Sequence, residues 1–191
     1  MTMHILRYGD LPASVWKNGG GITREIARGD HTGRMAWRLS MAEVAQDGAF
    51  SDFNGYQRIL TVIRGNGMVL HSPDTAMHAP RLVPVTFDGA TPIKATLTQG
   101  PLEDLNLIFD PLLCTGTVSI LADGATIAAG GSDVIAVVCV SGTLALADSD
   151  LRQGDCALLG PNTAPIDTAD ATALVVRLHH RKLISIIPSI M

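Results

Sequence analysis

MAWRLSMAEV, residues 35–44, is the stretch that decides the fold class of this chain. Its larger apolar side chains stand at every second position, so that Trp37 and Leu39 share one face while Arg38 and Ser40 share the other. A period of two residues is that of a β-strand, whose successive side chains point to opposite faces of a sheet. A similar short run covers residues 22–28, and no long stretch keeps the i, i+3, i+4 apolar spacing of an amphipathic helix. The sequence therefore predicts an all-β protein.

The composition predicts a folded protein and does not favour a nucleic acid or a membrane as partner. Of the 191 residues, 47% are hydrophobic and only 17% are charged, which is enough apolar material for a core. The net charge is −4, and no basic stripe is present that would favour nucleic acid or an anionic membrane. The chain opens without an apolar leader, and its 3 cysteines form no CxxC pair, so we expect a cytoplasmic protein with free thiols.

A faint internal repeat predicts two similar lobes. LTVIRG at residues 60–65 matches VVCVSG at residues 137–142, and both runs are followed by a further apolar stretch. We interpret each copy as a β-hairpin with a glycine turn at Gly65 or Gly142. Many short strands with even spacing favour small barrels, so we expect one lobe in residues 1–110 and a second in residues 111–191. One large irregular sandwich is the alternative.

The two predicted lobes differ in chemistry. All eight aromatic residues lie within residues 1–110, whereas the rest of the chain is rich in Ala, Val, Leu and Gly. A ligand site needs apolar walls and a few converging polar groups, so we place the site in the first lobe. The second lobe is expected to be structural, or to form half of a dimer interface.

A metal site is not expected. None of the six histidines forms an HxH, HxxH or HxxxH pair, and the adjacent His179 and His180 would point to opposite faces of a strand. A bound metal needs three or four converging ligands. We therefore expect neither a metal nor a cofactor.

The glycine-rich run WKNGGGIT, residues 16–23, is a candidate anion-binding loop. Consecutive glycines let the backbone approach a ligand closely, and successive N–H groups can form a concavity that holds an anion. The groups offered by the loop are Lys17, Asn18, Gly19, Gly20 and Gly21. The alternative is a plain turn before a strand, with Trp16 as a core anchor.

Polar residues on otherwise apolar strands form the second part of the candidate site. An arginine that enters a barrel must pair with an anion, which is either an internal carboxylate or a ligand. This applies to Arg58, for which the two readings stay open, and the internal candidates are Glu25 and Asp104. Asp104 shares one face of its strand with Asn106. The remaining candidates are the polar Arg38, Ser40 and Ser51 and the aromatic walls Trp16, Trp37, Phe50 and Phe53.

Taken in order, these runs resemble the HutD/Ves family. The resemblance covers residues 1–110 and rests on WKNGGGITREI (16–26), WRLSMA (37–42), GAFS (48–51), GYQR (55–58) and DLN (104–106). It implies a bicupin, with two cupin-like β-barrel (jelly-roll) lobes in one chain, and a homodimer. It also implies a role in moderating histidine utilisation by binding an intermediate such as N-formylglutamate or urocanate.

The sequence leaves three functions open. The first is a metal-free binding protein for a small carboxylate, with Arg58 on the carboxylate and the other candidate groups around it. The second is a metal-independent isomerase or hydrolase that uses Glu25 or Asp104 as acid or base, since burial raises a carboxyl pKa. The third is a subunit-interaction module without a ligand. We expect binding rather than catalysis.

Overall fold

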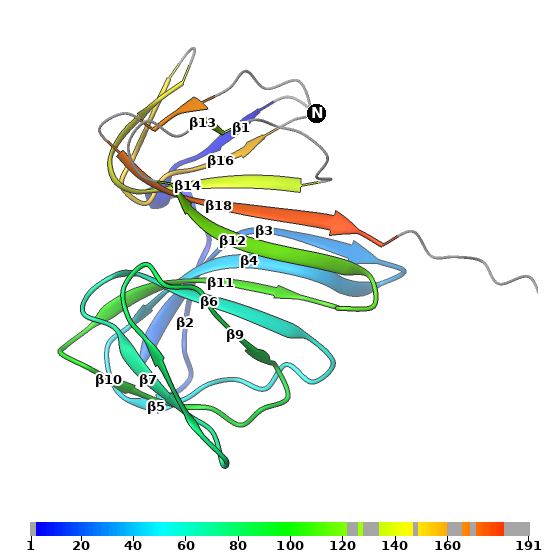
Figure 1. Ribbon diagram of the computed structural model, residues 1–191, viewed down its shortest axis with the longest axis vertical. Coiled ribbons are helices and arrows are strands. Elements are labelled where there is room, and N and C mark those ends of the chain that lie inside the picture. Colours follow the sequence, from blue (N-terminus) through cyan, green and yellow to red (C-terminus); the bar gives the residue numbers. More distant parts are fainter. Residues whose placement is uncertain are drawn as a thin grey trace, which may run out of the picture.

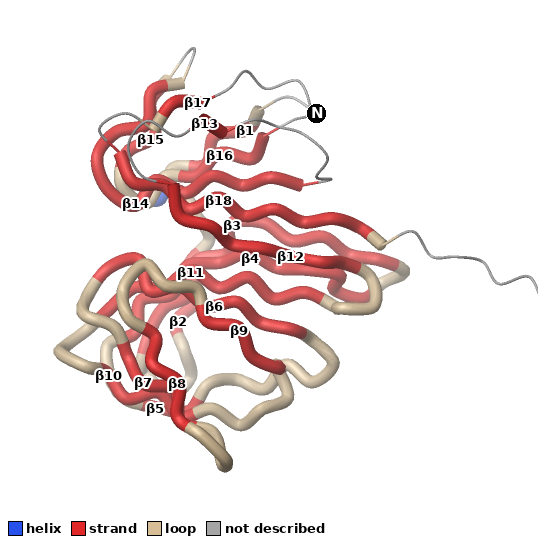
Figure 2. The backbone as a smooth tube through the Cα atoms, in the orientation of Figure 1, coloured by secondary structure: helices blue, strands red, loops and turns tan. Residues whose placement is uncertain are grey.

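The computed structural model of the chain describes residues 3–121, 126–127, 134–146, 149–159, 166–168 and 171–181. Nearly all of its regular structure is β-strand, with one short 3-10 turn, η1 (Tyr8–Asp10), near the N-terminus. The predicted all-β class is thus confirmed. Residues 182–191, the end of the predicted second lobe, lie outside the described part. The strands form three larger sheets and one small pair, which Figures 1 and 2 show from the same side.

The central sheet contains the segment that decided the fold class. Its strands run in the order β2 (Ala13–Val15), β3 (Gly21–His31), β4 (Arg34–Val44), β11 (Leu102–Phe109), β6 (Gln57–Arg64) and β9 (Val85–Asp88). Every neighbouring pair is antiparallel. All eight residues of β11 are buried, because apolar layers cover both faces of the sheet.

The lower sheet lies beneath the central sheet in Figure 1. It runs in the order β5 (Gly48–Ala49), β10 (Lys94–Leu97), β7 (Met68–His71) and β8 (Ala76–Ala79). Leu60 and Val62 of the central sheet and Met68 and Leu70 of the lower sheet are all fully or almost fully buried in one cluster. This cluster fills one end of the space between the two sheets.

The upper sheet is built mainly from the second half of the chain. It runs in the order β1 (His4–Leu6), β16 (Cys156–Leu159), β14 (Val134–Ala145), β18 (Ala171–His180) and β12 (Cys114–Leu121), with β15 (Asp150–Arg152) paired to β14. The small pair is β13 (Thr126–Ile127) with β17 (Ile166–Asp167). Strand β1 comes from the N-terminus, and its His4 lies opposite Leu158. One strand therefore crosses the boundary predicted at residue 110, and the division into two lobes stays a prediction.

The internal repeat has a counterpart in strand order. In the central sheet β4, β11, β6 and β9 are neighbours in that order, and in the upper sheet β12, β18, β14 and β16 are neighbours in the same relative order. The predicted hairpins, however, are wrong. Strand β6 pairs with β11 and β9, while β7 pairs with β10 and β8, so the turn at Gly65 carries the chain from one sheet to another. Gly142 lies inside the continuous strand β14. Both glycines have positive φ, 91° and 76°, which suits a sharp change of direction.

A second apolar layer joins the central and upper sheets. Leu39 and Leu107 of the central sheet belong to the same buried cluster as Val138 and Val176 of the upper sheet. The Leu107 side chain packs closely against Gly116 of β12, where an added Cβ would lie 2.8 Å from a Leu107 methyl carbon. The face of the central sheet that carries Leu39 and Leu107 is thus occupied by the upper sheet, and only the opposite face is left for a ligand.

Candidate functional site

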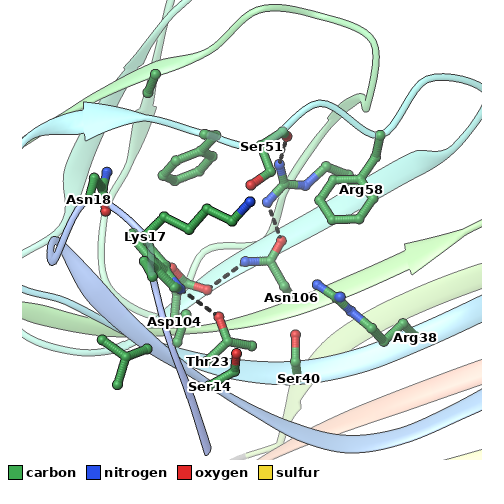
Figure 3. Close-up of a pocket in the computed structure, with 16 residues that line it drawn as sticks. Ser14, Lys17, Asn18, Thr23, Arg38, Ser40, Ser51, Arg58, Asp104 and Asn106 are labelled. Atoms are coloured by element: carbon green, nitrogen blue, oxygen red, sulfur yellow. Dashed lines mark hydrogen bonds between the residues drawn. The ribbon is translucent and has the colours of Figure 1, made fainter.

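A cavity of about 590 Å³ opens on the lower face of the central sheet. Its floor comes from β3, β4, β11 and β6, and its walls come from the loop before β3 and the segment after β5. Figure 3 shows its polar side chains gathered around one space. The cavity is lined by aromatic rings and by cationic side chains that contact them, which is the chemistry expected of a small-ligand site.

Strand alternation brings the predicted polar residues together. Arg38 and Ser40 of β4, Asp104 and Asn106 of β11, and Arg58 of β6 all line the cavity. Asn106 lies directly opposite Ser40 in the ladder, so these side chains stand side by side on the sheet. The period of two had fixed only which residues share a face, and the structure now assigns that face to the cavity.

Trp37 does not form a wall of this cavity, which corrects the prediction. It is 6% exposed and belongs to the core between the central and upper sheets, where it packs on Gly29. The reason is the same alternation: a side chain next to Arg38 in the strand must point to the other face. Trp16, Phe50 and Phe53, the other predicted walls, do line the cavity.

A buried chain of hydrogen bonds runs across the cavity floor. Arg58 donates from Nη2 to the side-chain oxygen of Asn106 at 2.8 Å, and Asn106 donates from Nδ2 to Oδ1 of Asp104 at 2.6 Å (Figure 3). The two partners together fix the orientation of the Asn106 amide. Arg58 is thus linked to Asp104 through an amide, and no ion pair between them is formed within the described part of the chain.

The Arg58 guanidinium is enclosed by aromatic rings. Its Cζ lies 5.1 Å from the ring centre of Phe50, 5.3 Å from that of Phe53 and 5.0 Å from that of Phe87. Burial lowers the pKa of Arg58 to about 10, against a smaller opposing effect of Asp104. Its Nε–H has no hydrogen-bond partner among the described residues, although the atom is buried. A buried donor without a partner costs free energy, and a desolvated guanidinium favours an anion beside it.

Arg38 supplies a second cation of the same kind. Its Cζ lies 5.2 Å from the Phe53 ring, so this ring contacts both guanidinium groups. Burial lowers the pKa of Arg38, and the carboxylate of Glu25 opposes this shift. Its Nε is also buried without a partner among the described residues. Both guanidinium groups of the cavity thus have an N–H group without a hydrogen-bond partner among the described residues.

Asp104 is the acidic group of the floor and is almost completely buried, at 1% exposure. Burial raises its pKa to about 7, and Arg58 and the hydrogen bond from Asn106 only partly oppose this. The carboxyl therefore changes charge near neutral pH, unlike an exposed aspartate.

This shift predicts a pH-dependent stability that Asp104→Asn removes. The folded pKa lies above the unfolded one, so the folded state holds the extra proton between about pH 4 and pH 7. The stability due to this group is complete below pH 4 and is lost as the pH rises to 7. We expect the free energy of unfolding of the wild type to fall across this window relative to Asp104→Asn, as measured by urea denaturation at several pH values. Parallel curves for the two proteins would contradict the shifted pKa.

The glycine-rich loop takes a different role from the predicted anion-binding one. The N–H of Gly19 donates to the carbonyl of Trp16 at 2.9 Å, and the N–H of Gly20 donates to Oδ1 of Asn18 at 3.0 Å. These two amides are therefore engaged within the loop. Gly21 is required for another reason, because an added Cβ would collide with the backbone oxygen of Glu43. The three glycines shape the loop and do not line the main cavity.

That loop presents Lys17 and Asn18 to the cavity. Both residues line it, and in Figure 3 the Lys17 side chain extends towards Arg58 and Ser51. Trp16 is anchored by a hydrogen bond from its indole Nε1 to the hydroxyl of Thr23 at 2.8 Å. The loop thus adds a third cation to the cavity at the end of a well-held segment.

The remaining predicted residues divide into two groups. Ser51 lines the cavity, and its backbone carbonyl accepts a long hydrogen bond from Arg58, 3.4 Å. Glu25 does not line the main cavity, but it lines two other hollows of about 280 and 490 Å³.

Two further residues of the cavity, Ser14 and Thr23, were not predicted from the sequence. They face each other on β2 and β3, and both line the cavity. The alternation within residues 22–28 was the available signal for Thr23, whereas Ser14 lies in a short exposed strand without a pattern.

Among the described residues, no group of three or more His, Cys, Asp or Glu side chains is placed to hold a metal ion. Within the same ranges, no helix is long and apolar enough to cross a membrane.

Sequence comparison relates the chain to a known family. The HutD family model matches residues 8–176. A protein of Pseudomonas putida described as an uncharacterized 21.2 kDa protein in the hutC 3' region is 42% identical over 114 residues, which are 57% of this chain and 59% of that protein. The chain thus spans less than two thirds of that relative. Protein Ves of Citrobacter koseri is 36% identical over 76% of this chain and 78% of its own length.

Solved structures support the same relationship. HutD from Pseudomonas fluorescens SBW25 superposes with a TM-score of 0.81 at 30% identity, over 95% of this chain and all of that one. A conserved protein of unknown function from Pseudomonas aeruginosa PAO1 gives a TM-score of 0.80 at 29% identity, over 94% of this chain and all of that one. Protein Ylba of Escherichia coli, at 9% identity and a TM-score of 0.72 over 95% of this chain and 93% of its own, shares the fold alone.

Proposed function

The chain belongs to the HutD family, and from that premise we propose that it is a metal-free binding protein for a small carboxylate. The observation that carries the proposal is the state of Arg58. A guanidinium that is buried, ringed by phenyl groups and left with an unpartnered Nε–H among the described residues suits an anion that arrives from outside. Arg is also the side chain that best matches the two oxygens of a carboxylate.

The charge of the cavity supports an anionic ligand. Lys17, Arg38 and Arg58 bring three cations, whereas Asp104 brings one carboxyl that changes charge near neutral pH. Low-dielectric walls strengthen the attraction between such a cluster and an anion.

The spacing of the two arginines favours a ligand with two anionic groups. Arg38 and Arg58 both lie opposite Ile108, on the two strands that flank β11. Strands in a sheet are about 4.8 Å apart, so the two Cα atoms are roughly 10 Å apart. A dicarboxylate such as N-formylglutamate can reach both guanidinium groups, whereas urocanate has one carboxylate. We place both in the proposed ligand class and expect the first to bind more tightly.

The biological role we propose is to sense or moderate histidine utilisation. It rests on membership of the HutD family and on the relative in the hutC 3' region. A ligand drawn from that pathway would report how fast the pathway runs. The predicted homodimer remains a prediction beside this proposal.

Metal-independent catalysis is the second candidate, and Asp104 is the observation that favours it. A carboxyl with a pKa of about 7 in a ligand cavity could act as acid or base. Glu25, the other predicted acid, does not line the main cavity. Catalysis predicts that ligand is consumed during incubation, whereas binding predicts that it is recovered unchanged.

A thermal-shift panel tests the proposed function. We would heat the protein with N-formylglutamate, urocanate, glutamate, formate or histidine, and analyse each mixture for product by chromatography. A ligand at 100 times its Kd stabilises by about 2.7 kcal/mol, which is a shift of roughly 5–10 °C for a chain of this size. We expect a shift of this size with N-formylglutamate and no product. No shift with any compound would contradict the proposal, and product formation would favour the enzyme.

A further inference from the structure

We propose that Asp104 makes the site selective for carboxylates that carry an N–H group on the carbon next to the carboxylate, that is, for α-amino acids and their N-acyl derivatives. This rests on the proposed function and narrows its ligand class. One oxygen of the Asp104 carboxyl has no hydrogen-bond partner within the described ranges, and this oxygen would recognise the N–H group.

Asp104 is a buried hydrogen-bond acceptor, and only one of its two carboxylate oxygens has a partner within the described ranges. It is 1% exposed, and one of its two oxygens accepts the bond from Asn106 at 2.6 Å. Within the described ranges, no hydrogen bond reaches its second oxygen, and no cation lies within ion-pair distance of the carboxyl. The residue nevertheless lines the cavity. Buried acceptors are normally satisfied, so a donor on the ligand is the natural partner.

The neighbours of Asp104 do not supply that donor. Along its row of the sheet, Asp104 lies opposite Ala42 on one side and Val62 on the other, neither of which has a polar side chain. Thr23, the next residue along the row and opposite Ala42, accepts from the Trp16 indole, and its own O–H makes no hydrogen bond with Asp104. Lys17 extends towards Arg58 and Ser51 in Figure 3, and it forms no ion pair with Asp104 within the described ranges.

The Asn106 bridge sets the spacing that a ligand must match. One amide, with its oxygen on Arg58 and its nitrogen on Asp104, spans the gap between the two charged groups. A ligand that lies alongside this bridge and contacts both groups needs an acceptor and a donor separated by a similar distance. A carboxylate oxygen and an N–H on the adjacent carbon meet this requirement. The carboxylate would then bind N–H groups of Arg58 that line the cavity, and the ligand N–H would bind the free oxygen of Asp104.

Three ligands that differ only around the nitrogen test the inference by calorimetric titration. N-formylglutamate carries the N–H, its N-methyl derivative replaces that hydrogen, and glutarate lacks the nitrogen but keeps both carboxylates. We expect the wild type to bind N-formylglutamate at least tenfold more tightly than either analogue. In Asp104→Asn, which is nearly isosteric, we expect that preference to fall below threefold, because its side-chain NH₂ would face the ligand N–H.

The outcomes distinguish a failure of this inference alone from a failure of the function on which it rests. Equal affinities for the three ligands in the wild type, with binding lost in Arg58→Ala, would overturn the role of Asp104 and leave the carboxylate site in place. A preference that persists in Asp104→Asn would also overturn it. Binding of none of the three would overturn the proposed function and the inference together. Asp30→Asn, the same change at an exposed aspartate of the central sheet that pairs with Arg28 and does not line the cavity, is the matched control and should keep the preference for the N–H ligand.

Discussion

Replacing Arg58 with alanine is expected to weaken the binding of the preferred carboxylate by roughly 100-fold, since losing one partner of a buried charged pair costs about 2–5 kcal/mol. The variant should fold, because it removes a buried guanidinium whose Nε has no partner among the described residues. Loss of this cation also leaves Asn106 without the donor that fixes its amide. Calorimetric titration of both proteins measures the change, and circular dichroism checks the fold.

Arg28→Ala is the control for this prediction. Arg28 is also on the central sheet, but it is about half exposed and pairs with Asp30 at 2.6 Å outside the cavity. Exposed pairs contribute little, so affinity for the ligand should change by less than about twofold. Equal losses in the two variants would mean that net charge, rather than the geometry around Arg58, attracts the ligand.

Leu107→Ala is expected to lower the free energy of unfolding by about 3 kcal/mol, within the range for buried leucines. Leu107 is 0% exposed and lies where the central and upper sheets meet, next to Gly116 of β12. The space left behind would not be filled easily, because the neighbouring Gly116 has no side chain that could move into it. The expected loss corresponds to a fall in Tm of roughly 6–12 °C.

Leu112→Ala provides the comparison at the same residue type. Leu112 is 76% exposed, so its truncation should change stability by less than about 0.5 kcal/mol. Calorimetric melting of both variants gives the two values. An equally small loss of unfolding free energy in Leu107→Ala and Leu112→Ala would contradict a close-packed apolar layer between the central and upper sheets.

The sequence was most informative where the alternation was regular. The period of two in residues 35–44 predicted that Arg38 and Ser40 share a face, and the structure places both on the cavity. The same rule could have removed Trp37 from the predicted walls, because it stands on the opposite face of that strand. Buried arginines were recognisable because an arginine within an apolar run needs an anion.

Strand pairing between distant segments and the geometry of turns could not be predicted from the alternation of side chains. The glycine repeat was visible, but hairpins were predicted where the chain passes from one sheet to another at Gly65 and runs on as one strand at Gly142. Pairing of β1 with β16 joins segments about 150 residues apart, as His4 with Leu158 shows, and no local pattern encodes it. The hydrogen bonds that occupy the amides of Gly19 and Gly20 depend on the exact turn geometry.

The central claim is that Arg58 receives the carboxylate of the ligand at the floor of the cavity. A crystal structure of the protein with the tightest-binding compound of the panel tests it most directly. We predict a carboxylate oxygen at hydrogen-bond distance, about 2.7–3.2 Å, from the Arg58 guanidinium, with the phenyl rings of Phe50 and Phe53 beside it. A ligand found elsewhere, for example in the hollow lined by Arg7 and Glu25, with Arg58 unchanged, would contradict the account.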